Sequence, residues 1–186
     1  MPKIADIEDT PNPNAKKFSL REPLSWGVAH SYDNAGQALD DELARAVFAI
    51  KHVTNVFYVD RWLTVTQDGG ADWNELAREI AVPLRAAPAA GEQSAATIAA
   101  AEASLAHLSE FDRARIDRIG ALLDEQIRPY LQGDGGDLHI VGIDENRLLV
   151  HFQGACGTCP SSLSGTFQSI EYLVHTIEPE LEVVPA

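Results

Sequence analysis

Residues 154–160 read GACGTCP, a glycine-rich loop that holds Cys156 and Cys159, the chain's two cysteines. The residues before the loop have the apolar pattern of a strand, and Pro160 suits the first turn of a helix after it. Free N–H groups and the positive end of a helix dipole favour a thiolate over a thiol, and the glycines let loop N–H groups approach sulfur. The loop is therefore predicted to favour anions, as either a thiolate-bound metal or a reactive thiol requires.

The elements around this loop predict a small α+β module over residues 109–186. Their apolar spacing changes from the helical period to the strand period and back. The expected elements are a helix capped by Ser109 with an apolar stripe from Phe111 to Tyr130, strands over 138–143 and 147–152, a helix over 163–177 and a short strand over 181–184. Residues 133–136 are interpreted as a turn, because a phosphate-binding loop would carry Lys-Ser/Thr and precede a helix.

The histidines are the other candidate metal ligands of this module. If residues 144–146 form a simple three-residue turn, His139 lies directly opposite His151 on one face of the hairpin. The core face then carries Leu138, Ile140, Val150 and Phe152. An exposed cross-strand pair is favoured over an accessory metal-ligand role for these two histidines. The remaining histidines, His30, His52, His107 and His175, are expected to be solvated or locally satisfied.

Residues 1–87 predict a second α+β module. Asp72 and Glu75 form a capping box, and Pro83 is expected to kink or end the helix that follows. Strands are expected over 16–20, 27–32, 55–59 and 62–66, and helices over 40–50 and from Asp72 onward. Trp62 and Trp73 fit core positions. The fold class is therefore two small α+β domains, 1–87 and 109–186, joined by an Ala/Pro-rich linker over 88–108.

Charge and composition exclude several classes of function. The chain has 14 Lys+Arg and 28 Asp+Glu among 186 residues, a net charge of −14, which makes nucleic acid and anionic membranes poor partners. No apolar run approaches the roughly 18–20 residues of a membrane-spanning helix. Residues 1–14 have the composition of neither a secretory signal nor an Arg-rich transit peptide, so a cytoplasmic location is expected.

The number of cysteines limits the chemistry of a metal site. An all-cysteine iron–sulfur cluster or a Cys₄ zinc site needs four thiolates, and one chain supplies two. Two chains, each giving Cys156 and Cys159, would complete such a site. A redox pair, half of a zinc site and half of an iron–sulfur site all remain possible on the residues alone.

Two sets of motifs resemble one known family. DGGD at 134–137 and GACGTCPSS at 154–162 look like the NifU-like domain of Nfu proteins. TPNPN at 10–14, followed by Lys17-Phe18, Val56-Phe57, Thr64-Val65-Thr66 and Asp72-Trp73, resembles the N-terminal domain of the same family. The resemblance covers nearly the whole chain except the linker.

The resemblance implies an iron–sulfur cluster scaffold or carrier and no enzyme. It implies that Cys156 and Cys159 are the ligands of a [4Fe–4S] cluster held between two subunits, with [2Fe–2S] also compatible with four cysteines. Ser162 and Thr166 match family positions but receive no ligand role. The implied partners are a second copy of the chain as a cluster-bridged homodimer, apo iron–sulfur clients and upstream cluster assembly proteins. The first module is associated by the same resemblance with client recognition.

Two rival functions use the same cysteines. A thioredoxin-like thiol–disulfide oxidoreductase would exploit the expected strand–CxxC–helix order, although the module lacks the leading βαβ unit of that fold. A structural zinc site could instead bridge two chains.

Overall fold

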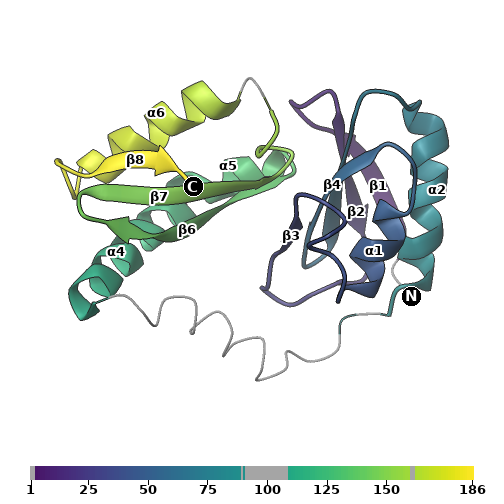
Figure 1. Cartoon of the computed structure of the whole chain (residues 1–186), viewed down its shortest axis with the longest axis horizontal. Coiled ribbons are helices and arrows are strands. Elements are labelled where there is room, and N and C mark those ends of the chain that lie inside the picture. Colours follow the sequence, from purple (N-terminus) through teal and green to yellow (C-terminus); the bar gives the residue numbers. More distant parts are fainter. Residues whose placement is uncertain (1–2, 89, 91–108, 160–161) are drawn as a thin grey trace. The chain divides into compact units, whose positions relative to one another are not determined.

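The computed structural model describes residues 3–88, 90, 109–159 and 162–186, which divide into two compact units, Met1–Gln93 and Ser94–Ala186 (Figure 1). Each unit packs helices on a β-sheet, so the predicted pair of α+β units is confirmed. Most of the predicted linker, and His107, lie outside the described residues, and the domain boundaries stay predictions. None of the described helices combines the length and the apolar character needed to cross a membrane.

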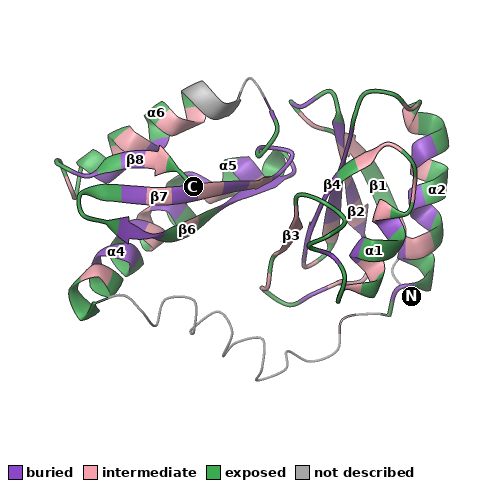
Figure 2. Cartoon of the chain, viewed as in Figure 1, coloured by how far each residue is buried: buried purple, intermediate pink, exposed green. Residues whose placement is uncertain are grey.

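The first unit is an antiparallel five-stranded sheet in the order β1-β2-β5-β4-β3. Its elements are β1 Ile4–Asp9, β2 Ala15–Leu20, β3 His30–Tyr32, α1 Glu42–Phe48, β4 Val53–Val59, β5 Trp62–Gln67 and α2 Trp73–Ala86. Alternate strand residues such as Phe18, Leu63 and Val65 form one core with Ile80 and Leu84 of α2. Figure 2 shows the buried side of α2 facing the sheet and its exposed side facing solvent.

Two features of this unit differ from what the sequence predicts. No strand is predicted over β1, whose six residues IADIED include three acids, yet β1 pairs with β2 as an edge strand. An edge strand is half-solvated and tolerates such polar residues. Of the two outcomes expected at Pro83, an end of the helix is contradicted: α2 continues to Ala86, because Pro83 removes only one backbone donor near the end of the helix.

A polar network holds α1 against β3 and β4. The carboxylate of Asp41 caps α1 by accepting from the backbone N–H of Ala44 at 2.8 Å. Its other oxygen accepts from the hydroxyl of Tyr32 at 2.7 Å and from the hydroxyl of Tyr58. His30 stacks on Tyr58, with ring centroids 4.5 Å apart. Burial acts to raise the pKa of Asp41, but these hydrogen bonds and His30 outweigh it and lower that pKa below its ordinary value.

Replacing Asp41 by alanine is expected to destabilise the first unit by about 2–4 kcal/mol, because a helix cap and two tyrosine hydrogen bonds are lost together. The carboxyl has a lowered pKa in the folded state, so this contribution is present above its ordinary pKa of 3.8 and fades as the pH falls through the folded-state value. Urea unfolding followed by tryptophan fluorescence measures this unit alone, because all three tryptophans lie in residues 1–93. Asp40→Ala, an exposed neighbour of equal charge, should change stability little.

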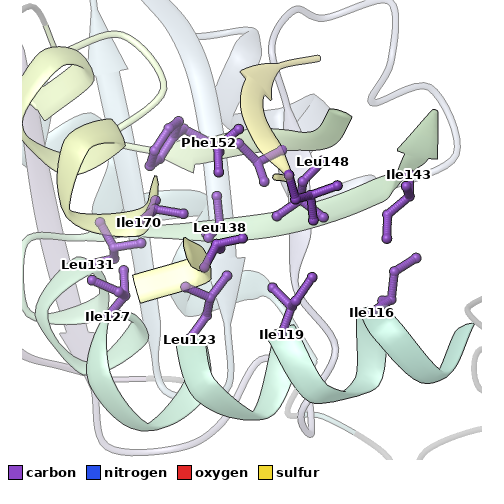
Figure 3. Close-up of a cluster of buried hydrophobic side chains, with 14 of the residues drawn as sticks. Ile116, Ile119, Leu123, Ile127, Leu131, Leu138, Ile143, Leu148, Phe152 and Ile170 are labelled. Carbon is purple, nitrogen blue, oxygen red and sulfur yellow. The ribbon is translucent and has the colours of Figure 1, made fainter. Parts of the chain in front are cut away.

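The second unit has a three-stranded sheet in the order β6-β7-β8, with β6 and β7 antiparallel and β8 parallel to β7. Its elements are α4 Glu110–Gln126, α5 Arg128–Gly133, β6 Gly136–Asp144, β7 Arg147–Gly154, α6 Ser162–His175 and β8 Glu182–Pro185. Figure 3 shows Ile119 and Leu123 of α4 meeting Leu138, Leu148 and other side chains of the sheet in one core.

The single long helix predicted from Ser109 is two helices. Ser109 caps α4, accepting from the N–H of Asp112 at 3.1 Å. The helix breaks at Ile127, because Pro129 has no N–H to donate to the carbonyl four residues earlier and its ring crowds that carbonyl. The predicted apolar stripe is also too long at both ends. Phe111 is 71% exposed and Tyr130 is 75% exposed, so neither belongs to the core.

The β6–β7 hairpin places the predicted residues on its two faces, although its turn and its strand pairing both differ from the prediction. Asp144 pairs with Arg147 across a two-residue turn, in which Glu145 has a φ of 53°. A β-bulge between Ile140 and Gly142 adds the residue that the shorter turn removes. His139 therefore lies opposite His151, as predicted, and Leu138, Val150 and Phe152 are buried on the core face.

Candidate functional site

The two cysteines lie in the connection between β7 and α6. Both thiols are free, and both residues are buried, with 2% of Cys156 and 1% of Cys159 exposed. Cys156 belongs to the hydrophobic core of the second unit, beside residues such as Phe152 and Ile170. The side chains of residues 160–164 lie outside the described part, so the site is built here from residues 154–159 and what touches them.

Backbone hydrogen bonds close the loop on itself. The N–H of Ala155 donates to the carbonyl of Gly135 at 3.1 Å, and the N–H of Gly157 donates to the carbonyl of Gly154 at 3.2 Å. The N–H of Cys159 donates to the carbonyl of Cys156 at 3.5 Å. These three donors point at carbonyl oxygens, so the expectation that they would point at sulfur is wrong for them.

Glycines allow the turn before β6 to touch the cysteine loop. Gly135 and Gly154 have φ values of 78° and 63°, which disfavour other residues. Gly136 pairs with Gly154 across the sheet, and a methyl group added to Gly136 would overlap the sulfur of Cys156 and lie 2.8 Å from the carbonyl oxygen of Gln153. The turn predicted over 133–136 is confirmed, and it forms one wall of the cysteine site.

The environment of Cys156 favours the thiol. Burial raises its pKa to about 12, and the nearby Asp134, Cys159 and Asp137 act in the same direction. The prediction of a thiolate-favouring loop is therefore wrong for Cys156 in the described conformation.

Arg128 and Asp137 brace the turn from behind. Asp137 is 4% exposed, and its carboxylate accepts from the N–H of Leu138 at 2.7 Å, from the Arg128 guanidinium and from Gln132 at 3.3 Å. Arg128 also donates to the carbonyl of Leu138 at 3.1 Å and to Asp124 at 2.7 Å. Asp137 thus lies at the start of β6 and ties it to α5. The i,i+4 spacing of Asp124 and Arg128 is the one signal by which Arg128 could be found from the sequence.

The histidine pair lies on the sheet face opposite the core. Burial, His151 and Arg128 lower the pKa of His139, which favours its neutral form. In the described ranges, no group of three His, Cys, Asp or Glu side chains is arranged to hold a metal ion. The structure therefore does not bring the histidines to the cysteines.

The other described histidines have local partners, as expected. His52 lies 3.0 Å from the carboxylate of Asp68, and His175 lies 3.1 Å from the carbonyl oxygen of Leu181. His30 stacks on Tyr58.

Comparison with known proteins gives two family matches in the order of the two units. Residues 4–91 match the model for "Scaffold protein Nfu/NifU N terminal", and residues 119–184 match the "NifU-like domain". The chain is also 32% identical to the human "NFU1 iron-sulfur cluster scaffold homolog, mitochondrial", over 95% of this chain and 69% of that protein. The chain belongs to the Nfu family. The resemblance read from the DGGD and CxxC motifs is confirmed.

The chain is also similar to plant proteins that are longer than it is. This Nfu chain is 33% identical over 157 residues to "NifU-like protein 5, mitochondrial" of Arabidopsis thaliana, covering 83% of this chain and 57% of that protein. It spans little more than half the length of the Arabidopsis relatives that it matches. The human relative is named an iron–sulfur cluster scaffold.

The relatives correct the predicted location of this Nfu chain. The human and Arabidopsis proteins are named as mitochondrial, so the expectation of a cytoplasmic location is wrong. That expectation rested on the composition of residues 1–14. These relatives are longer than the segment that they share with this chain. The composition of residues 1–14 is therefore no guide to location.

Proposed function

We propose that this chain is an iron–sulfur cluster scaffold or carrier, and that Cys156 and Cys159 of two chains together bind one [4Fe–4S] cluster as cargo. The observation that carries the proposal is the pair of free thiols in one glycine-shaped loop, with no group of three or more His, Cys, Asp or Glu side chains arranged to hold a metal among the described residues. Four thiolates complete such a cluster, and two chains supply four. The names of the relatives support iron–sulfur cargo.

Cargo binding requires the loop to expose its sulfur atoms. Both cysteines are buried, whereas a cluster shared by two chains must reach the loop of each. Gly154 and Gly157 let the backbone of the loop rearrange at low conformational cost. The Arg128–Asp137 pair, which lies behind the loop, keeps the turn at 134–136 in place while the loop moves. A cluster held in this way is close to the surface, where the cysteines of an apo client can displace its ligands.

The proposed partners follow from this cargo. They are a second copy of the chain, apo iron–sulfur clients that receive the cluster and upstream assembly proteins that supply it. Residues 109–186 are the proposed cluster domain and residues 1–87 the proposed recognition domain. A disulfide oxidoreductase is less well supported, because the human relative is named an iron–sulfur cluster scaffold.

Anaerobic reconstitution with iron and sulfide tests the nature of the cargo. We expect a brown protein with broad visible absorption and about two iron and two sulfide per chain, half of a [4Fe–4S] cluster. The metal content of the purified chain is measured first, so that any zinc already bound is detected. A protein that stays colourless and keeps zinc would contradict the proposal, and so would one that cycles between dithiol and disulfide without binding iron.

A further inference from the structure

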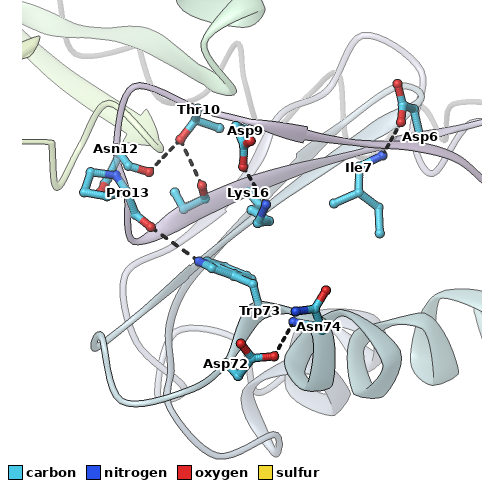
Figure 4. A network of polar contacts seen from close by, with 11 residues as sticks. Asp6, Ile7, Asp9, Thr10, Asn12, Pro13, Lys16, Asp72, Trp73 and Asn74 are labelled. Atoms are coloured by element: carbon cyan, nitrogen blue, oxygen red, sulfur yellow. Dashed lines mark hydrogen bonds and ion pairs between the residues drawn. The ribbon is translucent and has the colours of Figure 1, made fainter.

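A groove runs over the first unit between the edge strand β1 and helix α2. Its volume is about 560 Å³. One wall is formed by Ile4 and Ile7 of β1, and the floor by Ala77 and Ala81 of α2. Figure 4 shows the side chain of Ile7 on the side of β1 that faces α2, with Trp73 at the start of that helix.

The groove is open because its floor has small side chains. Ala77 and Ala81 are one helical turn apart and contribute only methyl groups, and Ala81 is 6% exposed. The wall stays partly uncovered, since 38% of Ile7 is exposed. Trp73 closes one end: its indole N–H donates to the carbonyl of Pro13 at 3.4 Å, and Lys16 lies 5.8 Å from its ring centre. Trp73 is half-buried: it packs against the core of the first unit, as predicted, and also lines this end of the groove.

The groove is basic in an acidic protein. Its lining includes Lys16, Arg78 and Arg85 and no acidic residue, whereas the whole chain has a net charge of −14. Lys16 is paired with Asp9 at 2.5 Å. Arg78 and Arg85 are exposed on α2 and form no ion pair or side-chain hydrogen bond within the described part of the chain. Two guanidinium groups on one side of the helix therefore border an apolar floor, and within the described part of the chain no carboxylate pairs with either of them.

We propose that this groove docks a short segment of a partner protein in which apolar side chains alternate with aspartates or glutamates. The apolar side chains would cover Ile7, Ala77 and Ala81, and the carboxylates would pair with Arg78 and Arg85. A polyanion such as nucleic acid interacts with the charge of the whole chain and is repelled. A short segment interacts mainly with the side chains that it touches, because charges beyond about 8 Å are screened at physiological salt, and the groove lining has basic but no acidic side chains. The proposal does not depend on the cargo of the cysteines.

Selection of peptides on the full chain tests the proposal. A display library of random short peptides is panned on the wild-type protein and counter-selected on Arg78→Glu/Arg85→Glu. We expect the enriched peptides to combine apolar and acidic residues, and the charge reversal to weaken their binding about tenfold or more. Arg21→Glu/Arg61→Glu is the matched control, with two exposed arginines of the same unit reversed outside the groove. Its binding should stay within about twofold of wild type after screening by physiological salt.

Three results would overturn the proposal. One is a selection in which no enriched peptide depends on Arg78 and Arg85. Another is equal weakening by the control, which would show that only the overall charge matters. The third is self-association of the wild-type protein in sedimentation that Arg78→Glu/Arg85→Glu abolishes, which would make a second copy the occupant. Because peptide binding is measured without iron, none of these results bears on cluster binding.

Discussion

Replacing either Cys156 or Cys159 by serine is expected to abolish stable cluster binding. Each chain offers two thiolates, so a single substitution removes half of its ligands and two of the four in the shared site. Loss of an outer-sphere partner already costs about 10- to 100-fold in metal affinity, and loss of two direct ligands should cost more. Iron and acid-labile sulfide retained after anaerobic reconstitution and desalting measure the effect. We expect less than about a tenth of the wild-type content.

The histidine pair provides the control for this prediction. His139 and His151 lie opposite each other on the sheet face away from the core, whereas Cys156 belongs to the core. The double variant His139→Ala/His151→Ala is therefore expected to retain its cluster in full. A double variant that cannot be reconstituted, or a Cys156→Ser variant that keeps its iron, would show that the ligands are assigned wrongly.

Replacing Gly136 by alanine is expected to disrupt the cysteine site without removing a ligand. The added methyl group would overlap the sulfur of Cys156 and lie 2.8 Å from its β-carbon. The cysteine loop or the start of β6 must then shift, at a cost of about 1–3 kcal/mol for overpacking. We expect the second unit to unfold at lower urea concentration, seen as a change in far-UV circular dichroism that the tryptophan fluorescence of the first unit does not follow, and a reduced yield of reconstituted cluster.

Gly120→Ala is the matched control for this substitution. Gly120 lies within α4, and a methyl group there meets no described atom within 4 Å. Alanine is the better helix former by about 1 kcal/mol, so this variant should be as stable as wild type or more so and bind its cluster normally. If Gly136→Ala behaved like Gly120→Ala, the close contact between the turn and the cysteine loop would not matter.

The sequence was sufficient to predict most elements of the fold. Apolar periodicity identifies α2 and the β6–β7 hairpin, because each buries one regular face in a local core. It does not identify β1, since an edge strand with three acids in six residues lacks the alternation of a buried one. The expected register of the hairpin is right only because a bulge compensates for a shorter turn, and neither feature has a signal in the periodicity.

The position of the cysteine site could be predicted from the sequence, but its burial, its thiol pKa and its supporting side chains could not. The CxxC spacing and its glycines give the position of the loop. The burial of Cys156 depends on Gly136 and on the core around it, which residues distant in the sequence assemble. For the same reason the sequence suggested a lowered thiol pKa where the structure raises it. The brace formed by Arg128 and Asp137 likewise joins α5 to β6 through side-chain geometry that spacing does not specify.

Native mass spectrometry of the wild-type protein before and after anaerobic reconstitution tests the central claim most directly. We expect the apo protein to be mainly a single chain, because residues 88–186 carry a net charge of −10 and two copies repel at close range. After reconstitution, the account predicts a species of two chains with about four iron and four sulfide. A single chain that holds a complete four-iron cluster, or an apo protein that is already dimeric at low micromolar concentration, would contradict it.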